Sequence, residues 1–259
     1  MLALIAGTGG LPPAILAGHP NALVCAMDGF APDLPVDISF RLEHLGSFLG
    51  QLTDRGITQV CFAGAVRRPT IDPTQVDVAT VPLIPVIKAA MAKGDDGALR
   101  AIMQVFEAHG LQMVAAHDLL PSLLPAAGVP TANKPNADMM AEAVLGERVV
   151  AKLGALDRGQ ACVVAGGKLL AEEGPEGTDA MLAGLIADSG ILYKAPKPTQ
   201  DRRADLPVIG AGTAQAVVDA GLDGIVIAAG GVMVLDFDAV VDTLDMAGKV
   251  LWVRPLTES

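Results

Sequence analysis

Short apolar runs alternate with segments of helical periodicity along the first half of the chain, and this alternation restricts the fold more than any other feature. Such runs are typical of strands that are buried on both faces, as in a helix-covered parallel sheet. We expect four strands, at 2–6, 22–27, 59–63 and 111–116. The pattern predicts an α/β domain with a mostly parallel, Rossmann-like sheet.

The clearest helix is expected after the motif Lys93-Gly94-Asp95-Asp96. Two carboxylates stand at the expected start, apolar residues follow at helical spacing, and Gly110 is a typical terminator. Helix capping explains the carboxylates well. Two adjacent carboxylates are too few for a complete hard-cation site, so we retain Asp96 as a polar contact for a ligand.

Four prolines between Pro121 and Pro135, without periodicity, are typical of a linker. They divide the chain into an N-terminal nucleotide-binding α/β domain at 1–125, a linker at 126–136 and a C-terminal α/β domain at 137–259. In the last of these we expect a helix at about 138–156 and strands at 161–164, 191–193, 224–228, 232–235 and 250–253. The expected fold is therefore two α/β domains joined by a linker.

The composition excludes several classes of protein. Hydrophobic residues make up 51% of the 259-residue chain and charged residues 18%, which is typical of a globular protein. The longest uncharged apolar stretch, 224–235, is too short to cross a bilayer. The net charge of −11 disfavours nucleic acid as a partner. The three cysteines are far apart and no basic segment precedes the apolar start, so we expect reduced thiols and a cytoplasmic protein.

A glycine turn follows the first expected strand, in the motif Gly7-Thr8-Gly9-Gly10-Leu11-Pro12. Backbone amides at the start of the next helix suit a phosphate. Asp28 follows at the spacing at which an acidic residue binds a ribose hydroxyl in dinucleotide-binding folds. Proline stands where that fingerprint has its third glycine. The motif predicts a nucleotide phosphate site, with a tight turn that binds nothing as the alternative.

A second glycine loop, Gly64-Ala65-Val66-Arg67-Arg68-Pro69, follows the expected strand at 59–63. Loops at the carboxyl ends of parallel strands face the ligand crevice in doubly wound folds. Because the arginine fork matches phosphate oxygens, one of the two arginines is a candidate clamp for a diphosphate. The alternative is a pair of solvated arginines before a turn.

The segment from Glu176 to Asp205 gathers charge in an otherwise apolar chain. Glu176-Gly177-Thr178-Asp179 opens a helical pattern, with Thr178 or Asp179 as the expected N-cap. Its carboxylates oppose a bare phosphate unless a divalent ion stands between them or they bind hydroxyls instead. Downstream, a loop stiffened by prolines carries Lys194, Lys197, Arg202 and Arg203, for which a solvated charge run is the alternative.

Taken in order, these motifs resemble the UDP-2,3-diacylglucosamine pyrophosphatases of lipid A biosynthesis, the type unrelated to calcineurin-like metallophosphoesterases. The resemblance covers nearly the whole chain, and six weak motifs in one order are specific together. They are Leu4–Pro12, Cys61–Gly64 with Arg68-Pro69, Lys93–Asp96, Glu176–Met181, Lys194–Pro198 with Gln200, and Asp205–Pro207.

The resemblance implies a Mg²⁺-dependent hydrolysis that yields UMP and 2,3-diacylglucosamine 1-phosphate from a substrate held between two α/β domains. The family's essential aspartate falls on Asp205, and our hypothesis is that Asp205 and Asp179 hold the metal. The motifs and the resemblance together predict these substrate contacts: Gly9, Gly10, Leu11, Gly64, Ala65, Val66, Arg67, Asp96, Gln160, Glu176, Gly177, Thr178, Asp179, Lys194 and Gln200.

Two positions depart from the family pattern. Ala65 stands where the family usually has asparagine, which removes a side-chain hydrogen bond, and Arg67-Arg68 replaces a serine-arginine pair. Two other functions stay open at this stage, an NAD(P)-binding oxidoreductase and a non-enzymatic sensor of a phosphorylated metabolite. The expected partner is the UDP-linked diacylated glucosamine, and we expect no binding to nucleic acid. Any membrane contact would be peripheral, at the inner membrane, and the protein could form a homo-oligomer.

Overall fold

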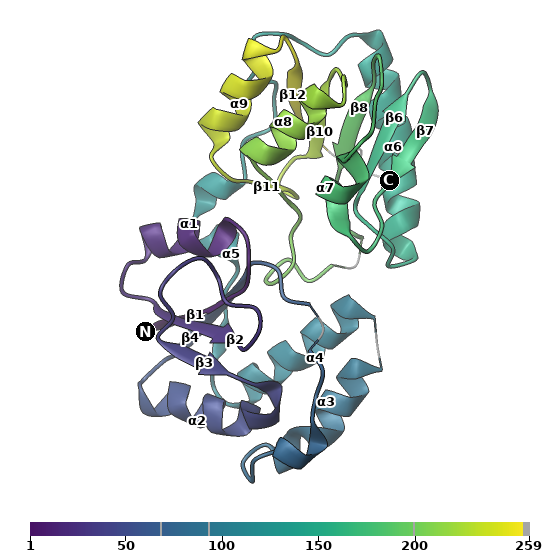
Figure 1. Ribbon diagram of the computed structural model, residues 1–259. Helices are drawn as coiled ribbons and strands as arrows, with labels where there is room; N and C mark the ends of the chain where they lie inside the picture. Colours follow the sequence, from purple (N-terminus) through teal and green to yellow (C-terminus); the bar gives the residue numbers. More distant parts are fainter. Residues whose placement is uncertain (68, 93, 199, 256–259) are drawn as a thin grey trace. The chain divides into compact units, whose positions relative to one another are not determined.

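The computed structural model describes residues 1–67, 69–92, 94–198 and 200–255. The chain forms two compact units (Figure 1). The first unit is built from Met1–Pro121 together with Asp201–Asp205, and the second from Ser122–Gln200 together with the chain from Leu206 onward.

The first unit contains a five-stranded sheet in the order β3-β2-β1-β4-β5, and every pairing in it is parallel. The strands are β1 (Leu2–Ala6), β2 (Leu23–Met27), β3 (Ile38–Phe40), β4 (Gln59–Ala63) and β5 (Gln112–Met113). In the centre, Leu2 pairs with Gln59 and Ala6 with Ala63, so β1 and β4 end at the same level. The predicted parallel α/β sheet is confirmed, and β3 is an additional strand.

Helices cover both faces of this sheet, with α1 and α5 on one side and α2 and α4 on the other (Figure 1). The helices are α1 (Leu11–Gly18), α2 (Leu45–Asp54), α3 (Ile84–Met91), α4 (Asp95–Ala108) and α5 (Ala116–Leu119), with 3-10 turns at Leu42–His44, Pro73–Gln75, Val81–Leu83 and Pro121–Leu123. Phe48 of α2 stacks on Phe40 at 4.0 Å, and Phe106 of α4 meets Phe48 edge-on. The helix predicted after Gly94 is α4.

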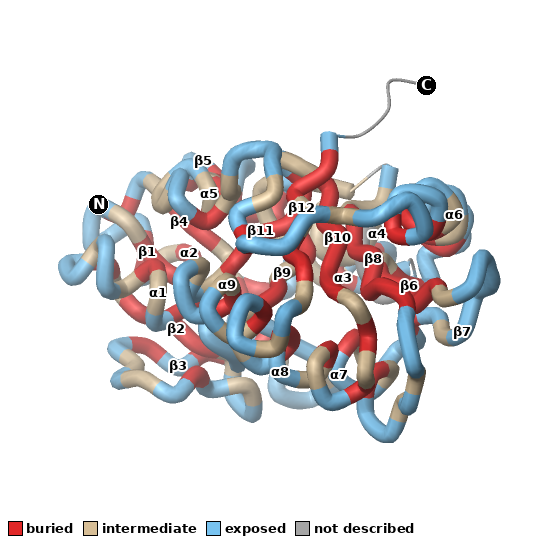
Figure 2. Tube along the Cα trace, turned by 90° about the horizontal axis from the view of Figure 1, so that it is seen from above, coloured by how far each residue is buried: buried red, intermediate tan, exposed pale blue. Residues whose placement is uncertain are grey.

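The second unit has a mixed sheet in the order β12-β10-β8-β6-β7, in which β12, β10 and β8 are parallel and β6 and β7 run antiparallel. The strands are β6 (Ala161–Ala165), β7 (Lys168–Glu172), β8 (Ile191–Lys194), β10 (Gly224–Ala228) and β12 (Val250–Arg254), and β9 (Val208–Ile209) pairs separately with β11 (Met233–Val234). Figure 2 shows β8 and β10 as buried and the edge strand β7 as largely exposed.

Four helices pack on this sheet: α6 (Ala137–Ala155), α7 (Gly177–Leu182), α8 (Ala211–Asp219) and α9 (Phe237–Met246). The Asn136 side chain caps α6 by accepting a hydrogen bond from the Met139 amide. Gly146 allows α6 to approach β8, because a Cβ at Gly146 would lie 2.6 Å from the Cβ of the buried Tyr193. Among the helices described, none has both the length and the apolar character that a membrane span requires.

The two units differ from the division expected at 1–125, 126–136 and 137–259. The segment 126–136 lies within the second unit, where Gly128 and Val253 exchange two backbone hydrogen bonds of 2.9 Å. Residues 201–205 lie in the first unit: Arg203 pairs with Glu107 at 2.6 Å, and Ala204 packs against the apolar core there. Prolines within 126–136 and on either side of 201–205 mark both segments as irregular, but they do not show which core an irregular segment joins.

Candidate functional site

Two glycine loops lie side by side at the carboxyl ends of β1 and β4. The Gly7 amide donates to the Ala63 carbonyl at 2.8 Å, and Thr8 and Ala65 exchange backbone hydrogen bonds of 3.0 and 2.8 Å. A Cβ at Gly7 would lie 2.4 Å from the Ala65 carbonyl oxygen. The loops therefore meet backbone to backbone, and a side chain at Gly7 would separate them.

The start of α1 follows directly on this contact. Gly10 is the N-cap residue, with no side-chain hydrogen bond to the cap from the described residues, and proline occupies the first turn. Gly9 has a φ of +100° and, like Gly10, is exposed, whereas the Leu11 side chain is buried. The first-turn amides are therefore oriented to bind an anion, and the predicted contact at Leu11 is restricted to its backbone.

The loop after β4 places Gly64, Ala65, Val66 and Arg67 at the same edge of the sheet as the start of α1, and all four are exposed. Seven of the predicted contacts are thus brought together in the first unit: Gly9, Gly10, Leu11, Gly64, Ala65, Val66 and Arg67. The second arginine, Arg68, lies outside the described residues, as does the side chain of Asp96 in α4.

A cavity of about 330 Å³ lies in the second unit. Five predicted contacts line it, namely Glu176, Gly177, Thr178, Asp179 and Lys194. The rest of its wall comes from the residue that follows β7 and from β9, the start of α8 and the end of β11: Glu173, Val208, Ile209, Gly210, Thr213 and Leu235. We refer to it below as the polar pocket.

Three polar side chains in the wall of the polar pocket are buried and bonded to one another. Lys194 donates to the Thr178 hydroxyl at 2.5 Å, and that hydroxyl donates to the Glu173 carboxylate. The Lys194 Nζ atom lies 3.7 Å from the same carboxylate. Sequence reasoning missed Glu173, because nothing in the order of residues indicates that it meets Thr178 and Lys194.

The structure corrects the predicted cap of the helix in this pocket. Glu176, not Thr178 or Asp179, is the N-cap residue of α7, and the Thr178 side chain turns toward Glu173 and Lys194 instead. Asp179 is exposed in the first turn. The carboxylates of Glu176 and Asp179 therefore stay available to a ligand at the mouth of the pocket.

Gln160 and Gln200, the remaining predicted contacts, lie outside the polar pocket. The Gln160 amide donates to Glu173 at 2.7 Å, while its side-chain Oε1 atom is buried without a hydrogen-bond partner among the described residues. The Gln200 side chain accepts a hydrogen bond from the Lys197 amide at 3.0 Å and so stabilises the loop after β8. Gln160 thus supports the pocket wall from behind, and Gln200 shapes the neighbouring loop.

The basic residues of the proline-stiffened loop are not a uniform solvated run. Lys197 pairs with Asp157 at 2.5 Å. Arg203 pairs with Asp201 at 2.8 Å and with Glu107 at 2.6 Å, and its hydrogen bonds to Asp201 hold the pKa of that carboxyl below its usual range. These pairs organise the chain around Asp205, whose amide lies 3.3 Å from the Asp201 carbonyl oxygen.

The segment Glu176–Asp205 is therefore divided between the two units, with Asp179 in the second and Asp205 in the first. Among the residues that the structure describes, no three His, Cys, Asp or Glu side chains form a group that could hold a metal ion. A hard cation at either aspartate would need oxygen ligands from a substrate or from water.

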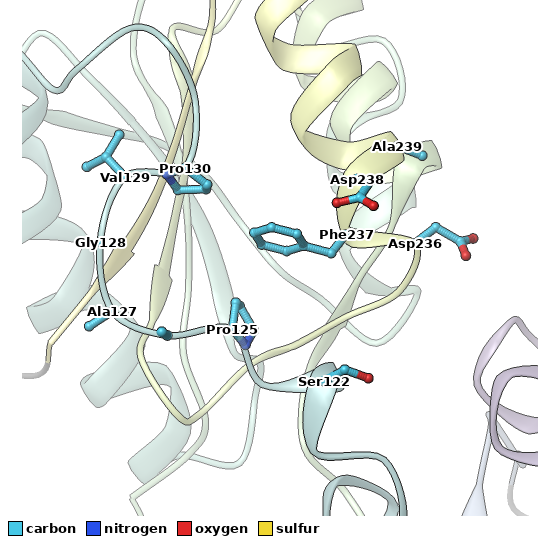
Figure 3. Close-up of a pocket in the computed structure, with 11 residues that line it drawn as sticks. Ser122, Pro125, Ala127, Gly128, Val129, Pro130, Asp236, Phe237, Asp238 and Ala239 are labelled. Atoms are coloured by element: carbon cyan, nitrogen blue, oxygen red, sulfur yellow. The ribbon is translucent and has the colours of Figure 1, made fainter. Parts of the chain in front are cut away.

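A larger, open cavity of about 900 Å³ lies elsewhere in the second unit (Figure 3). The segment 122–130 and the start of α9 line it, and the Phe237 ring projects from α9 toward Pro125 and Pro130 while the Asp236 carboxylate points away. Leu235, the residue before Asp236, lines the polar pocket. No residue predicted from the sequence falls in this cavity, which we refer to as the apolar cavity.

Comparison with known proteins agrees with the two-unit architecture. The family model described as the LpxI N-terminal domain matches residues 1–123, and the one described as the LpxI C-terminal domain matches residues 126–252. The UDP-2,3-diacylglucosamine pyrophosphatase LpxI of Caulobacter vibrioides is 36% identical in an alignment that covers 98% of each chain.

Proposed function

Because the chain belongs to the LpxI family, we propose that it hydrolyses the pyrophosphate bond of UDP-2,3-diacylglucosamine in lipid A biosynthesis, yielding UMP and 2,3-diacylglucosamine 1-phosphate. The resemblance inferred from the sequence motifs is confirmed, and the chain is a hydrolase of a phosphorus anhydride. The structural observation that most directly supports the proposed substrate is the polar pocket, where five residues of two separate motifs meet.

We assign the UMP portion of the substrate to the glycine loops of the first unit. The start of α1 offers backbone amides without a side chain in front of them, at Gly9 and Gly10. Such a helix start binds phosphate through its amides and its dipole. Arg67 is exposed in the adjoining loop, and its guanidinium suits a phosphate in two-pronged geometry. Ala65 makes backbone hydrogen bonds to Thr8 but lacks the side-chain hydrogen bond expected of asparagine.

We assign the sugar phosphate to the polar pocket. The Glu176 and Asp179 carboxylates accept hydrogen bonds from sugar hydroxyls, and Lys194 supplies positive charge for a phosphoryl oxygen. Such charge stabilisation by preorganised groups provides much of the catalysis of phosphoryl transfer.

We retain Asp205 and Asp179 as the ligands of a Mg²⁺ ion. Carboxylate oxygens are the ligands that Mg²⁺ prefers, and one or two of them with substrate phosphates and water form its usual site on phosphate esters. When bound, the ion would neutralise charge on the diphosphate oxygens. Asp205 is held for this role by the Asp201 and Arg203 pairing beside it.

We place an acyl chain of the substrate in the apolar cavity. Its volume of about 900 Å³ exceeds that of one long acyl chain. Prolines, alanines, Val129 and Phe237 make up most of its lining, together with Ser122, Asp236 and Asp238. Leu235 of the polar pocket and Asp236 of the apolar cavity are consecutive residues, so a sugar phosphate and its acyl chain have adjacent sites. Shortening the acyl chains should raise KM for this protein, and Phe237→Ser should remove much of that dependence.

Phosphorus NMR of UDP-2,3-diacylglucosamine turnover, with Mg²⁺ and with chelator, tests the proposal. We expect UMP and a sugar 1-phosphate with Mg²⁺, and neither with chelator. Asp205→Ala should retain the fold and lose at least about a hundredfold in kcat, since it removes a group required at the reacting phosphates. The control is Asp54→Ala, at the exposed end of α2 in the same unit. Equal turnover in the two variants would remove Asp205 from the reaction.

The two alternative functions make distinct predictions. An NAD(P)-dependent oxidoreductase would enhance NADPH fluorescence on binding, and a sensor would bind substrate without releasing UMP; we expect neither. We also propose that the protein acts in the cytoplasm and touches the inner membrane only peripherally, where its diacylated substrate resides. Co-sedimentation with anionic vesicles at low and high salt tests this contact.

A further inference from the structure

The Glu173, Thr178 and Lys194 side chains are buried, with exposed fractions of 8%, 7% and 6% for the residues. The ammonium group of Lys194 can only donate hydrogen bonds, so Thr178 must accept from it and give its own proton to Glu173. The direction of both hydrogen bonds is therefore fixed by chemistry. Glu173 terminates the chain of bonds and carries the charge that balances Lys194.

The backbone holds Glu173 in this position independently of Lys194. Its second carboxylate oxygen accepts the Gln160 amide at 2.7 Å, and its own amide donates to Ala161 at 3.0 Å. Glycine is required at position 159, because a Cβ there would lie 2.5 Å from the Glu173 carbonyl oxygen. A carboxylate fixed in this way can determine where the lysine side chain lies.

The charge of the polar pocket makes this arrangement important for a ligand. The Glu176 and Asp179 carboxylates in its wall repel a phosphoryl group, and among its lining residues Lys194 supplies the positive charge. A buried ammonium is held by the hydroxyl and carboxylate groups that fix it, and it tends to move when one of them is lost. Without Glu173, the Lys194 ammonium would therefore no longer be held at the position a phosphoryl oxygen requires.

We propose that Glu173 is a positioning residue, which acts through Thr178 to hold the charged end of Lys194 in the wall of the polar pocket for a sugar-linked phosphoryl group. The proposal rests on the proposed function for the identity of the ligand. Its effect on that ligand is exerted through Lys194.

The direct test uses glucosamine 1-phosphate as the probe, titrated calorimetrically into the full chain, alongside kcat/KM for UMP release. Glu173→Gln should weaken binding on the order of 30-fold, as expected for a buried charge that loses its partner. The matched control is Glu172→Gln, the same change one residue earlier, at an exposed side chain that pairs with Arg158; it should change binding less than about twofold. Glu173→Asp keeps the charge and should recover most of the lost affinity.

A double-mutant cycle separates positioning from a general effect on the fold. In a Lys194→Gln background, Glu173→Gln should change binding less than about threefold, because the residue it positions is gone. A full 30-fold loss in that background, or equal binding by Glu173→Gln and Glu172→Gln, would overturn the proposal. If the protein bound glucosamine 1-phosphate in this pattern but released no UMP, the proposed function would fail and the positioning role would stand.

Discussion

Gly64 provides a test of how the two glycine loops of the first unit are held together. It has a φ of +88°, and a Cβ there would lie 2.7 Å from the Thr8 carbonyl oxygen and 2.8 Å from the Gly7 carbonyl carbon. Gly29 has nearly the same φ, +86°, but its Cβ would have no atom within 4 Å. Comparison of Gly64→Ala with Gly29→Ala therefore separates the cost of the close contact from the cost of the backbone conformation.

The magnitudes follow from these two contributions. A left-handed conformation costs a residue with a Cβ about 1–2 kcal/mol, and this applies to both variants. Overpacking against groups that cannot easily move adds about 1–3 kcal/mol, and this applies to Gly64→Ala alone because the atoms it meets are backbone. We expect Gly29→Ala to lower the free energy of unfolding by about 1–2 kcal/mol and Gly64→Ala by about 2–5 kcal/mol.

Urea unfolding measures the difference in unfolding free energy between the two variants. The positions of the aromatic residues show which unit is destabilised. The single Trp252 and the single Tyr193 both belong to the second unit, so their fluorescence reports that unit, while far-UV circular dichroism reports both. Gly64→Ala should shift the dichroism transition to lower urea and leave the Trp252 transition in place. It should also raise KM, since the loops assigned to UMP separate. Equal destabilisation by the two variants would refute the argument from close contact.

Three further predictions concern other parts of the molecule. Hydrogen bonds from Arg41 lower the pKa of the buried Glu43 to about 2. The stabilisation that ionised Glu43 gives the folded state is therefore fully present above the unfolded pKa near 4.5 and is lost as the pH falls through about 2. Glu43→Gln should cost about 2 kcal/mol in urea unfolding at pH 7 and progressively less as the pH falls toward about 2. Arg203→Ala should lower kcat without changing the Trp252 unfolding transition, because it releases the segment before Asp205 from Glu107; an unchanged kcat would contradict this. Burial raises the pKa of all three thiols to about 12, so a thiol reagent at pH 8 should label none in the native protein and all in urea: Cys25, Cys61 and Cys162.

The strands that are clearest in the sequence are those buried on both faces. The central strand β1 and its neighbour β4 are apolar along their length because helices cover both faces, and such runs are visible without knowledge of the fold. The missed strands lack that signal. Ile38–Phe40 alternates buried and exposed residues but is only three residues long, and Val208–Ile209 has only two residues. Lys168–Glu172 lies at a sheet edge with little burial, so it shows no apolar pattern.

The residues of the candidate site also fall into two groups, those that could be found from the sequence and those that could not. Residues that function as a local motif, such as the glycines before α1 and the sequence Glu176–Asp179, could be selected from the sequence because their neighbours define the local geometry. Glu173 could not, because its partners Thr178 and Lys194 come from α7 and β8. The cap at Thr178 was predicted wrongly for the same reason: its hydroxyl is a good capping group in isolation, but a buried ammonium competes for it.

Chain connectivity links the residue proposed for catalysis to the pocket proposed for the sugar phosphate. The chain passes from the second unit to the first after Gln200 and returns after Asp205. Leu206 and Pro207 alone separate Asp205 from Val208, which lines the polar pocket. Three peptide units span at most about 11 Å, so covalent geometry keeps the Cα atom of Asp205 within that distance of the Cα atom of Val208. Lengthening this connection by two glycines after Leu206 should therefore reduce kcat while binding of glucosamine 1-phosphate persists, whereas an unchanged kcat would show that the short connection plays no part in catalysis.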